Sequence, residues 1–194
     1  MRSPYNFIVE PVDGKRYTDT KSYGDGVDFI VNSDSEDAQC TNREAIVRAL
    51  PINYDGPITE GCFLMVHHNV FRMYTDMKGR LRNGRSYFKD GLYFIDSEQY
   101  FMWRRPDGDW EPVGKFCFVE PEGPHETWIS KFTQHEPLMG RVTYPSEDLI
   151  SNGVSRGDLV YFLPDSEYEF FVNGKKMYRM QSRNITMQLN GQGT

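Results

Sequence analysis

Hydrophobic residues in this chain occur in short runs, and glycine, proline, asparagine or aspartate separates one run from the next. The runs are rich in β-branched and aromatic residues, which is typical of strands. Almost no stretch has the 3.6-residue spacing of an amphipathic helix. The pattern therefore predicts an all-β protein, with strands at 5–11, 44–50, 62–67, 85–88, 92–95 and 100–104, and again at 115–120, 139–144, 159–163, 167–172, 177–180 and 185–189.

The two halves of the sequence repeat one another in four blocks that keep the same order, and such self-similarity indicates architecture. FIVEP matches CFVEP, EAIVRALP matches GRVTYP, and ITEGCFLMV matches VSRGDLVYF. In the last block, DGLYFIDSEQYF matches NGKKMYRMQSRNIT when Tyr93 is aligned with Tyr178. We therefore expect two tandem domains, 1–108 and 109–194, joined near 106–113, with a long loop at 12–43 and an inserted hairpin at 73–85.

Glycine positions in the repeated blocks predict specific turns. Asp90-Gly91 and Asn173-Gly174 are favoured in two-residue hairpins, because both central positions of a type I′ turn have positive φ. Gly61 and Gly157 each precede an apolar run, where glycine allows a left-handed reversal into a buried strand. Hairpin, reversal and strand order together predict a small β-barrel in each half.

The second half resembles the ten-kilodalton co-chaperonin family, the GroES-like lids of chaperonins. In that family a strand that starts with glycine is followed by a Val-x-x-Gly-Asp turn, a barrel strand and a late hairpin. The resemblance implies two tandem, partly open GroES-like barrels and a role in closing a chaperonin chamber. The residues that match the family pattern are Gly140, Val154, Gly157, Asp158, Gly174, Tyr178, Met180 and Ile185.

The first half is similar to a more divergent copy, in which Ala45 replaces the strand glycine and Cys62 replaces the aspartate. Family members carry a long flexible loop whose apolar tripeptide docks in a groove of the chaperonin ring. The resemblance implies that this protein forms a homo-oligomeric ring, has a GroEL-like chaperonin as its partner and assists client proteins indirectly. The corresponding docking residues are Gly26, Val27, Phe29, Ile30 and Val31.

The sequence also departs from the family pattern. Asp28 interrupts the apolar tripeptide, and the second half offers only 122–136 as a loop, with Trp128, Ile129 and Phe132 as its anchors. The connections at 51–58 and 145–154 are too short for a roof hairpin. Tandem copies are similar to plastid co-chaperonins, whereas the short roof is similar to those of bacteriophages. The alternative is a structural capsid or tail protein of a virion, because one fold can serve unrelated functions.

Charge and composition narrow the classes of partner. A net charge of −6 disfavours nucleic acid, since phosphate binding draws on clustered lysine and arginine. The basic run at 78–85 is expected to be a solvated hairpin loop, with phosphate or partner contact as the alternative. No stretch approaches the ~20 apolar residues of a membrane span. Three cysteines, far apart and odd in number, favour a reducing compartment, so we expect a cytoplasmic protein, in the host cytoplasm if it is viral.

Candidate chemistry in the sequence is sparse, and we expect no enzyme, no cofactor and no metal. His67 and His68 are adjacent on an expected strand and would point to opposite faces, while His125 and His135 fall in a polar segment. The acidic run at 34–37 lacks the rest of a calcium loop. No nucleophile or nucleotide motif is present. The aromatic residues of the first half are expected to pack in its core and between the two barrels, with contact to a neighbouring subunit as the alternative.

Overall fold

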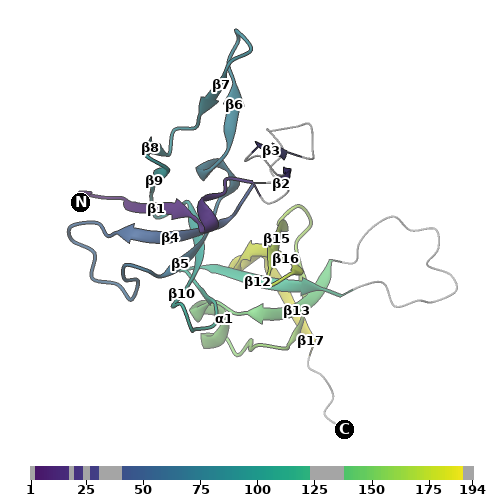
Figure 1. Cartoon of the computed structure of the whole chain (residues 1–194). Helices are drawn as coiled ribbons and strands as arrows, with labels where there is room; N and C mark the ends of the chain where they lie inside the picture. Colours follow the sequence, from purple (N-terminus) through teal and green to yellow (C-terminus); the bar gives the residue numbers. More distant parts are fainter. Residues whose placement is uncertain (1–2, 18–19, 24–26, 31–40, 123–137, 190–194) are drawn as a thin grey trace, which may run out of the picture. The chain divides into compact units, whose positions relative to one another are not determined.

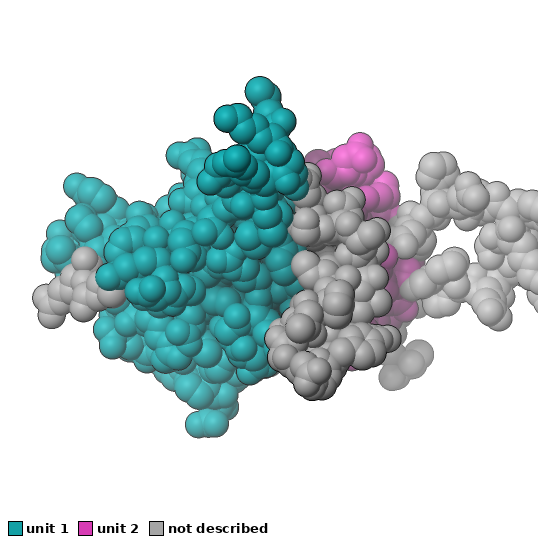
Figure 2. All heavy atoms as spheres, turned by 45° about the horizontal axis from the view of Figure 1, so that its top comes forward, with its two compact units in different colours: residues 1–110 teal, residues 111–194 magenta. Residues whose placement is uncertain are grey.

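The computed structural model describes residues 3–17, 20–23, 27–30, 41–122 and 138–189. The chain divides into two compact units, Met1–Trp110 and Glu111–Thr194 (Figure 2), whereas the sequence placed the division after residue 108. Strands in antiparallel sheets dominate both units, and one α-helix occurs in the described part. The prediction of an all-β protein is therefore confirmed.

Unit 1 is built on one antiparallel sheet with the strand order β10-β5-β4-β1-β9-β8 (Figure 1). The first strand of the chain lies in the interior of this sheet, between β4 and β9. The short 3-10 helices η1 (Val12–Gly14) and η2 (His68–Val70) follow strands of this sheet. The strands are β1 (Phe7–Pro11), β4 (Glu44–Ala49), β5 (Phe63–Val66), β8 (Tyr87–Lys89), β9 (Leu92–Ile95) and β10 (Tyr100–Arg104).

Unit 2 has the same arrangement, with the order β17-β14-β13-β12-β16-β15. Each strand thus has a counterpart in unit 1, and β12 takes the interior position of β1. The two-residue strand β11 (Glu111–Pro112) and the 3-10 helix η4 (Ser182–Asn184) complete the unit. Its other elements are β12 (Phe116–Pro121), β13 (Met139–Tyr144), α1 (Glu147–Ser151), β14 (Leu159–Phe162), β15 (Tyr168–Val172), β16 (Lys175–Gln181) and β17 (Ile185–Leu189).

The register of the central pair of strands is the same in both units. Pro11 is opposite Ala45 in the β1–β4 pair, and Pro121 is opposite Gly140 in the β12–β13 pair. Both pairs shift register at the equivalent place, after the second residue of FIVEP or CFVEP. Ala45 therefore occupies the position of Gly140, as the sequence alignment predicted.

The other neighbour of the central strand is also equivalent. Tyr93 on β9 is opposite Val9, and Tyr178 on β16 is opposite Val119. This is the alignment of the two tyrosines on which the fourth repeated block depended. Two unrelated sheets would have no reason to share order, register and irregularity, so the predicted internal repeat extends to the backbone.

The predicted turns are present. Asp90 and Gly91 have φ of 48° and 76°, and Asn173 and Gly174 have φ of 51° and 76°, as type I′ hairpins require. Sheet pairing leaves β8 at one edge of the unit 1 sheet, and β17 and β15 at the two edges of the unit 2 sheet. Among the described residues no strand pairing joins these edges.

The reversal before β5 and β14 uses the same hydrogen bonds in each unit. Gly61, with φ of 86°, donates its N–H to the carbonyl of Val47 at 2.9 Å. Gly157, with φ of 93°, donates to the carbonyl of Val142 at 2.7 Å. Both glycines hold a conformation that a Cβ disfavours, which explains their conservation between the two repeats of this chain.

Aromatic side chains fill the core of each unit, as expected. Phe71 and Tyr93 pack edge to face with ring centroids 4.8 Å apart in unit 1, and Phe118 and Phe170 do so at 5.7 Å in unit 2. Tyr74 and Phe88 were also expected in the core, but both are exposed. The aromatic residues predicted for the first core that are buried are Tyr93, Tyr100, Phe101, Trp103 and Trp110.

The helix α1 is an element that the hydrophobic pattern did not predict. Ser146 caps it, because its Oγ accepts a hydrogen bond from the N–H of Leu149 at 3.3 Å. Glu147 and Asp148 follow in the first turn, where negative charge is favourable. The sequence Ser-Glu-Asp after a proline was a usable signal, but a single turn with one buried residue, Leu149, has no visible periodicity.

Tyr93 provides a test of the unit 1 core. Its hydroxyl is buried without a hydrogen-bond partner among the described residues, and burial raises the pKa of the phenol to about 12. Removing an unpaired buried hydroxyl relieves a desolvation cost, so Tyr93→Phe is expected to leave the free energy of unfolding unchanged or raise it by up to about 1 kcal/mol. Urea titration measures this.

A matched control is Tyr54→Phe, because the Tyr54 hydroxyl accepts a hydrogen bond from the N–H of Ile58. That change is expected to cost about 1 kcal/mol. A loss of stability for Tyr93→Phe as large as that for Tyr54→Phe would contradict the prediction.

Candidate functional site

The apolar docking segment predicted from the sequence lies on a strand. β3 (Val27–Ile30) pairs with β2 (Thr20–Tyr23) in a two-stranded antiparallel sheet separate from the main sheet, with Tyr23 opposite Val27 and Thr20 opposite Ile30. The expected flexible loop thus has extended, paired backbone at Val27, Phe29 and Ile30. Valine, phenylalanine and isoleucine favour strands, which the loop prediction did not weigh.

The remaining predicted docking residues are not among those that the structure describes. Gly26 and Val31 lie outside the described residues, as do all three anchors of the second loop, Trp128, Ile129 and Phe132. The chain order nevertheless relates the two segments, because one connects β1 to β4 and the other connects the equivalent strands β12 and β13.

The described residues on either side of segment 18–40 meet at a closed neck, which we define as residues 15–17 and 41–42. Tyr17 and Thr41 form an antiparallel bridge, and the N–H of Asn42 donates to the carbonyl of Arg16 at 2.8 Å. The Asn42 side-chain amide donates to the carbonyls of Lys15 at 2.8 Å and Val12 at 3.2 Å. Tyr17, Thr41 and Asn42 are buried, so the neck is part of the packed unit.

A second two-stranded element of unit 1 is attached at the same neck. The β6–β7 hairpin consists of β6 (Met73–Thr75) and β7 (Leu81–Asn83), within the insertion predicted at 73–85. The N–H of Met73 donates to the Tyr17 hydroxyl at 3.1 Å, and Arg16 Nη1 donates to Asn83 Oδ1 at 2.7 Å. The hairpin base is therefore fixed to the neck through neighbouring residues.

The tip of the β6–β7 hairpin is ordered by one carboxylate. Asp76 Oδ1 accepts the N–H groups of Lys78 and Arg80, each at 2.9 Å, and its Oδ2 accepts Arg82 Nε at 3.0 Å. These hydrogen bonds hold the pKa of Asp76 below its usual value, and the bond from the Arg80 N–H has the largest effect. The basic run thus lies in an exposed hairpin, as expected, and Asp76 orders its turn.

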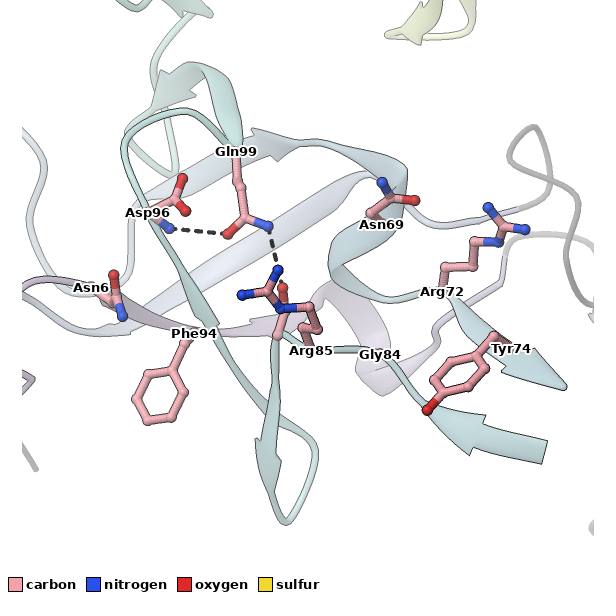
Figure 3. A pocket seen from close by; sticks show the side chains of 10 residues that line it. Asn6, Asn69, Arg72, Tyr74, Gly84, Arg85, Phe94, Asp96 and Gln99 are labelled. Atoms are coloured by element: carbon pink, nitrogen blue, oxygen red, sulfur yellow. Dashed lines mark hydrogen bonds between the residues drawn. The ribbon is translucent and has the colours of Figure 1, made fainter. Parts of the chain in front are cut away.

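A polar pocket of about 540 Å³ lies beside the base of the β6–β7 hairpin (Figure 3). Gln99 Nε2 donates to Ser86 Oγ at 3.3 Å, and Gln99 Oε1 accepts the N–H of Asp96 at 3.1 Å. The backbone at Gly84 approaches the backbone at Arg72 closely, because a Cβ at Gly84 would lie 2.9 Å from the carbonyl oxygen of Arg72. The lining is Asn6, Asn69, Arg72, Tyr74, Gly84, Arg85, Ser86, Phe94, Asp96 and Gln99.

The prediction that His67 and His68 point to opposite faces of a strand is wrong. β5 ends at Val66, His67 caps the 3-10 helix η2, and the two imidazole rings lie 4.2 Å apart at an interplanar angle of 33°. The strand geometry does not apply after the chain turns. Within the described part no three histidine, cysteine or acidic side chains gather as a metal site. His125, His135 and the acidic run 34–37 lie outside the described residues.

Cysteine chemistry is equally restricted in the described residues. Cys62 and Cys117 are buried free thiols, and Cys40 lies outside the described residues. Burial raises the pKa of the Cys117 thiol to about 12, so its reactive thiolate is scarce at neutral pH. Neither described cysteine has the exposed, electropositive setting of a nucleophile.

His68 predicts a pH dependence of stability. Burial first, and then His67, Arg43 and Arg72, lower the pKa of His68 from 6.5 to about 4. The unfolded chain takes up this proton near pH 6.5 and the folded chain only near pH 4, so stability present above pH 6.5 is lost as the pH falls toward 4. Because solvent screens the part-exposed ring, we expect a loss of about 1 kcal/mol.

His68→Gln removes this proton and is expected to reduce the difference in unfolding free energy between pH 7 and pH 4.5 by that amount. Urea titrations at the two pH values measure it, and equal pH dependence in the two proteins would contradict the assignment.

Comparison with models of known protein families and with curated protein sequences finds no match to this chain. Of the helices in the described part, none has the length and apolar character needed to cross a membrane. The class that the fold defines is an all-β protein of two units with one strand order, in which unit 1 also contains the β2–β3 and β6–β7 pairs.

Proposed function

We propose that this protein is a co-chaperonin, which caps a chaperonin ring through apolar segments and acts by binding, without covalent chemistry of its own. The observation that carries the proposal is the equivalent placement of the two apolar segments. One, with Val27, Phe29 and Ile30, connects β1 to β4, and the other, with Trp128, connects the equivalent strands of unit 2. A tandem of modules with the GroES-like sequence pattern accounts for this symmetry.

The neck supports this proposal because it fixes the place at which the docking segment joins the unit. Because Tyr17 pairs with Thr41 and the Asn42 amide donates to the carbonyls of Val12 and Lys15, the two ends of the long segment are held together at one fixed point of the unit. A strand-forming apolar segment on such a tether suits addition to a groove or sheet edge of a partner. Burying two or three apolar side chains contributes roughly 2 kcal/mol each at best, before ordering costs.

Single segments would therefore bind weakly, and a ring of several copies would supply avidity, because later contacts become intramolecular. A homo-oligomeric ring with two docking segments per chain fits this requirement. The proposed partner is a GroEL-like ring in the cytoplasm, and the proposed product of the interaction is a closed chamber for a client protein.

Co-sedimentation tests the proposal. The purified protein is mixed with a GroEL-type chaperonin and ADP or ATP, centrifuged with the ring, and assayed for its effect on ATP turnover. We expect nucleotide-dependent co-sedimentation and reduced turnover. Absence of association, together with recovery of the protein from intact virions, would instead support the structural virion protein.

A further inference from the structure

The β6–β7 hairpin exposes apolar side chains on both of its faces. Tyr74 is opposite Arg82 and Leu81 is opposite Thr75, so Tyr74 and Leu81 belong to opposite faces of the two-stranded sheet. They are 49% and 51% exposed, and Met77 at the tip is fully exposed. Figure 1 shows the hairpin extending away from the main sheet of unit 1. Neither face therefore contributes to the core of the unit.

A projecting two-stranded hairpin is marginal in water by itself, and this one is held by specific contacts. Tyr17 and Arg16 fix its base, and Asp76 orders its tip through three hydrogen bonds. The exposed side chains are thus carried on a preorganised backbone, which lowers the entropy lost when a partner covers them. These contacts are more than a solvated loop requires.

The charge of the hairpin, compared with that of the rest of the chain, indicates which kind of partner it suits. Residues 73–85 contain four basic side chains and one acidic side chain, a formal charge of +3. Because the whole chain carries −6, the remaining residues carry −9. The hairpin is thus a basic, apolar projection on an otherwise acidic molecule, and opposite potentials favour association of one copy with the next.

The chain also presents surfaces of matching chemistry. The connection from β4 to β5 exposes Ile52 and also contains the exposed acidic residues Asp55 and Glu60. The equivalent connection in unit 2 contains α1, which exposes Ile150 beside Glu147. Each combines an aliphatic side chain with negative charge, the complement of Met77 and Leu81 with their flanking cations.

We infer that the β6–β7 hairpin is a self-association element. It docks on the acidic connections that carry Ile52 and Ile150 in a second copy of this chain. The inference rests on the homo-oligomeric ring of the proposed function and names a contact between its copies. Its failure can be told apart from failure of the proposed function, because it is measured with no chaperonin present.

The test is the mass of the protein in solution as a function of concentration, by sedimentation equilibrium. Two double variants address the two components of the contact, Lys78→Glu with Arg80→Glu and Met77→Ser with Leu81→Ser. All four side chains are exposed, and Asp76 and Arg82 are kept so that the hairpin folds. The wild type is expected to assemble, and each variant is expected to associate at least about tenfold more weakly.

A matched control is Lys115→Glu with Arg183→Glu, which changes the net charge equally at exposed positions of unit 2. It is expected to assemble as the wild type does. Raised salt is expected to weaken wild-type assembly and to have less effect on the charge-reversed variant. A monomeric wild type, or hairpin variants that assemble normally with unchanged circular dichroism, would overturn the inference, as would binding of DNA by a monomer through this hairpin.

Discussion

Replacing Gly140 by alanine is expected to lower the free energy of unfolding of unit 2 by about 3 kcal/mol, since overpacking of this kind forces backbone shifts. A Cβ at this position would lie 2.5 Å from the carbonyl oxygen of Glu120 and 2.6 Å from Val119 Cγ1. Both neighbours belong to the interior strand β12, which is paired on its two sides and has little freedom to move. Urea unfolding followed by circular dichroism measures the change.

Unit 1 supplies the control, because Ala45 already occupies the equivalent position opposite Pro11 and is fully buried. Ala45→Gly removes a methyl group from a strand and is expected to cost about 1 kcal/mol. The two substitutions are reciprocal, yet both should destabilise, because each unit has adapted its spacing to its own residue. A stable Gly140→Ala protein would show that β12 and β13 can separate more readily than their packing indicates.

Changing Val27, Phe29 and Ile30 to serine is expected to abolish nucleotide-dependent co-sedimentation with a chaperonin while leaving the melting temperature of the main sheets unchanged. The three side chains would together contribute up to about 6 kcal/mol per docking event, on the order of 10⁴-fold in affinity. Because β2 and β3 pair with each other in their own sheet, the substituted residues take no part in the strand pairing of β1 or β4.

The matched control replaces three exposed apolar side chains elsewhere, Leu163, Phe171 and Met187, by serine. This variant removes comparable apolar surface and is expected to co-sediment as the wild type does. Equal loss of binding in both variants would indicate a nonspecific hydrophobic contact. Full binding by the first variant would remove β3 from the proposed interface.

Most of the sheet could be predicted from the sequence, because its strands carry β-branched and aromatic residues between strong turn signals. The type I′ hairpin at Asp90-Gly91 and the reversal at Gly61 follow from residues whose backbone preferences leave few alternatives. The alignment of Tyr93 with Tyr178 was predictable because both face the interior strand of their unit, where packing limits substitution.

The elements that escaped prediction are short and owe their structure to local hydrogen bonds. The helix α1 depends on the Ser146 cap, and the turn that stacks His67 on His68 begins where β5 ends. The neck was also not predicted from the sequence, because Tyr17, Thr41 and Asn42 are polar or amphipathic residues that are far apart in the chain and meet only in the fold. Patterns within a short window carry no information on such contacts.

The interior position of β1 has a consequence for synthesis on the ribosome. The first strand to emerge needs β4 on one side and β9 on the other, and β9 begins only at Leu92. The sheet of unit 1 therefore stays incomplete until nearly all of the unit has left the exit tunnel. Pairing strands that are far apart in the sequence also slows folding. Unit 2 repeats this delay with β12 and β16, so each half matures as a whole, one after the other.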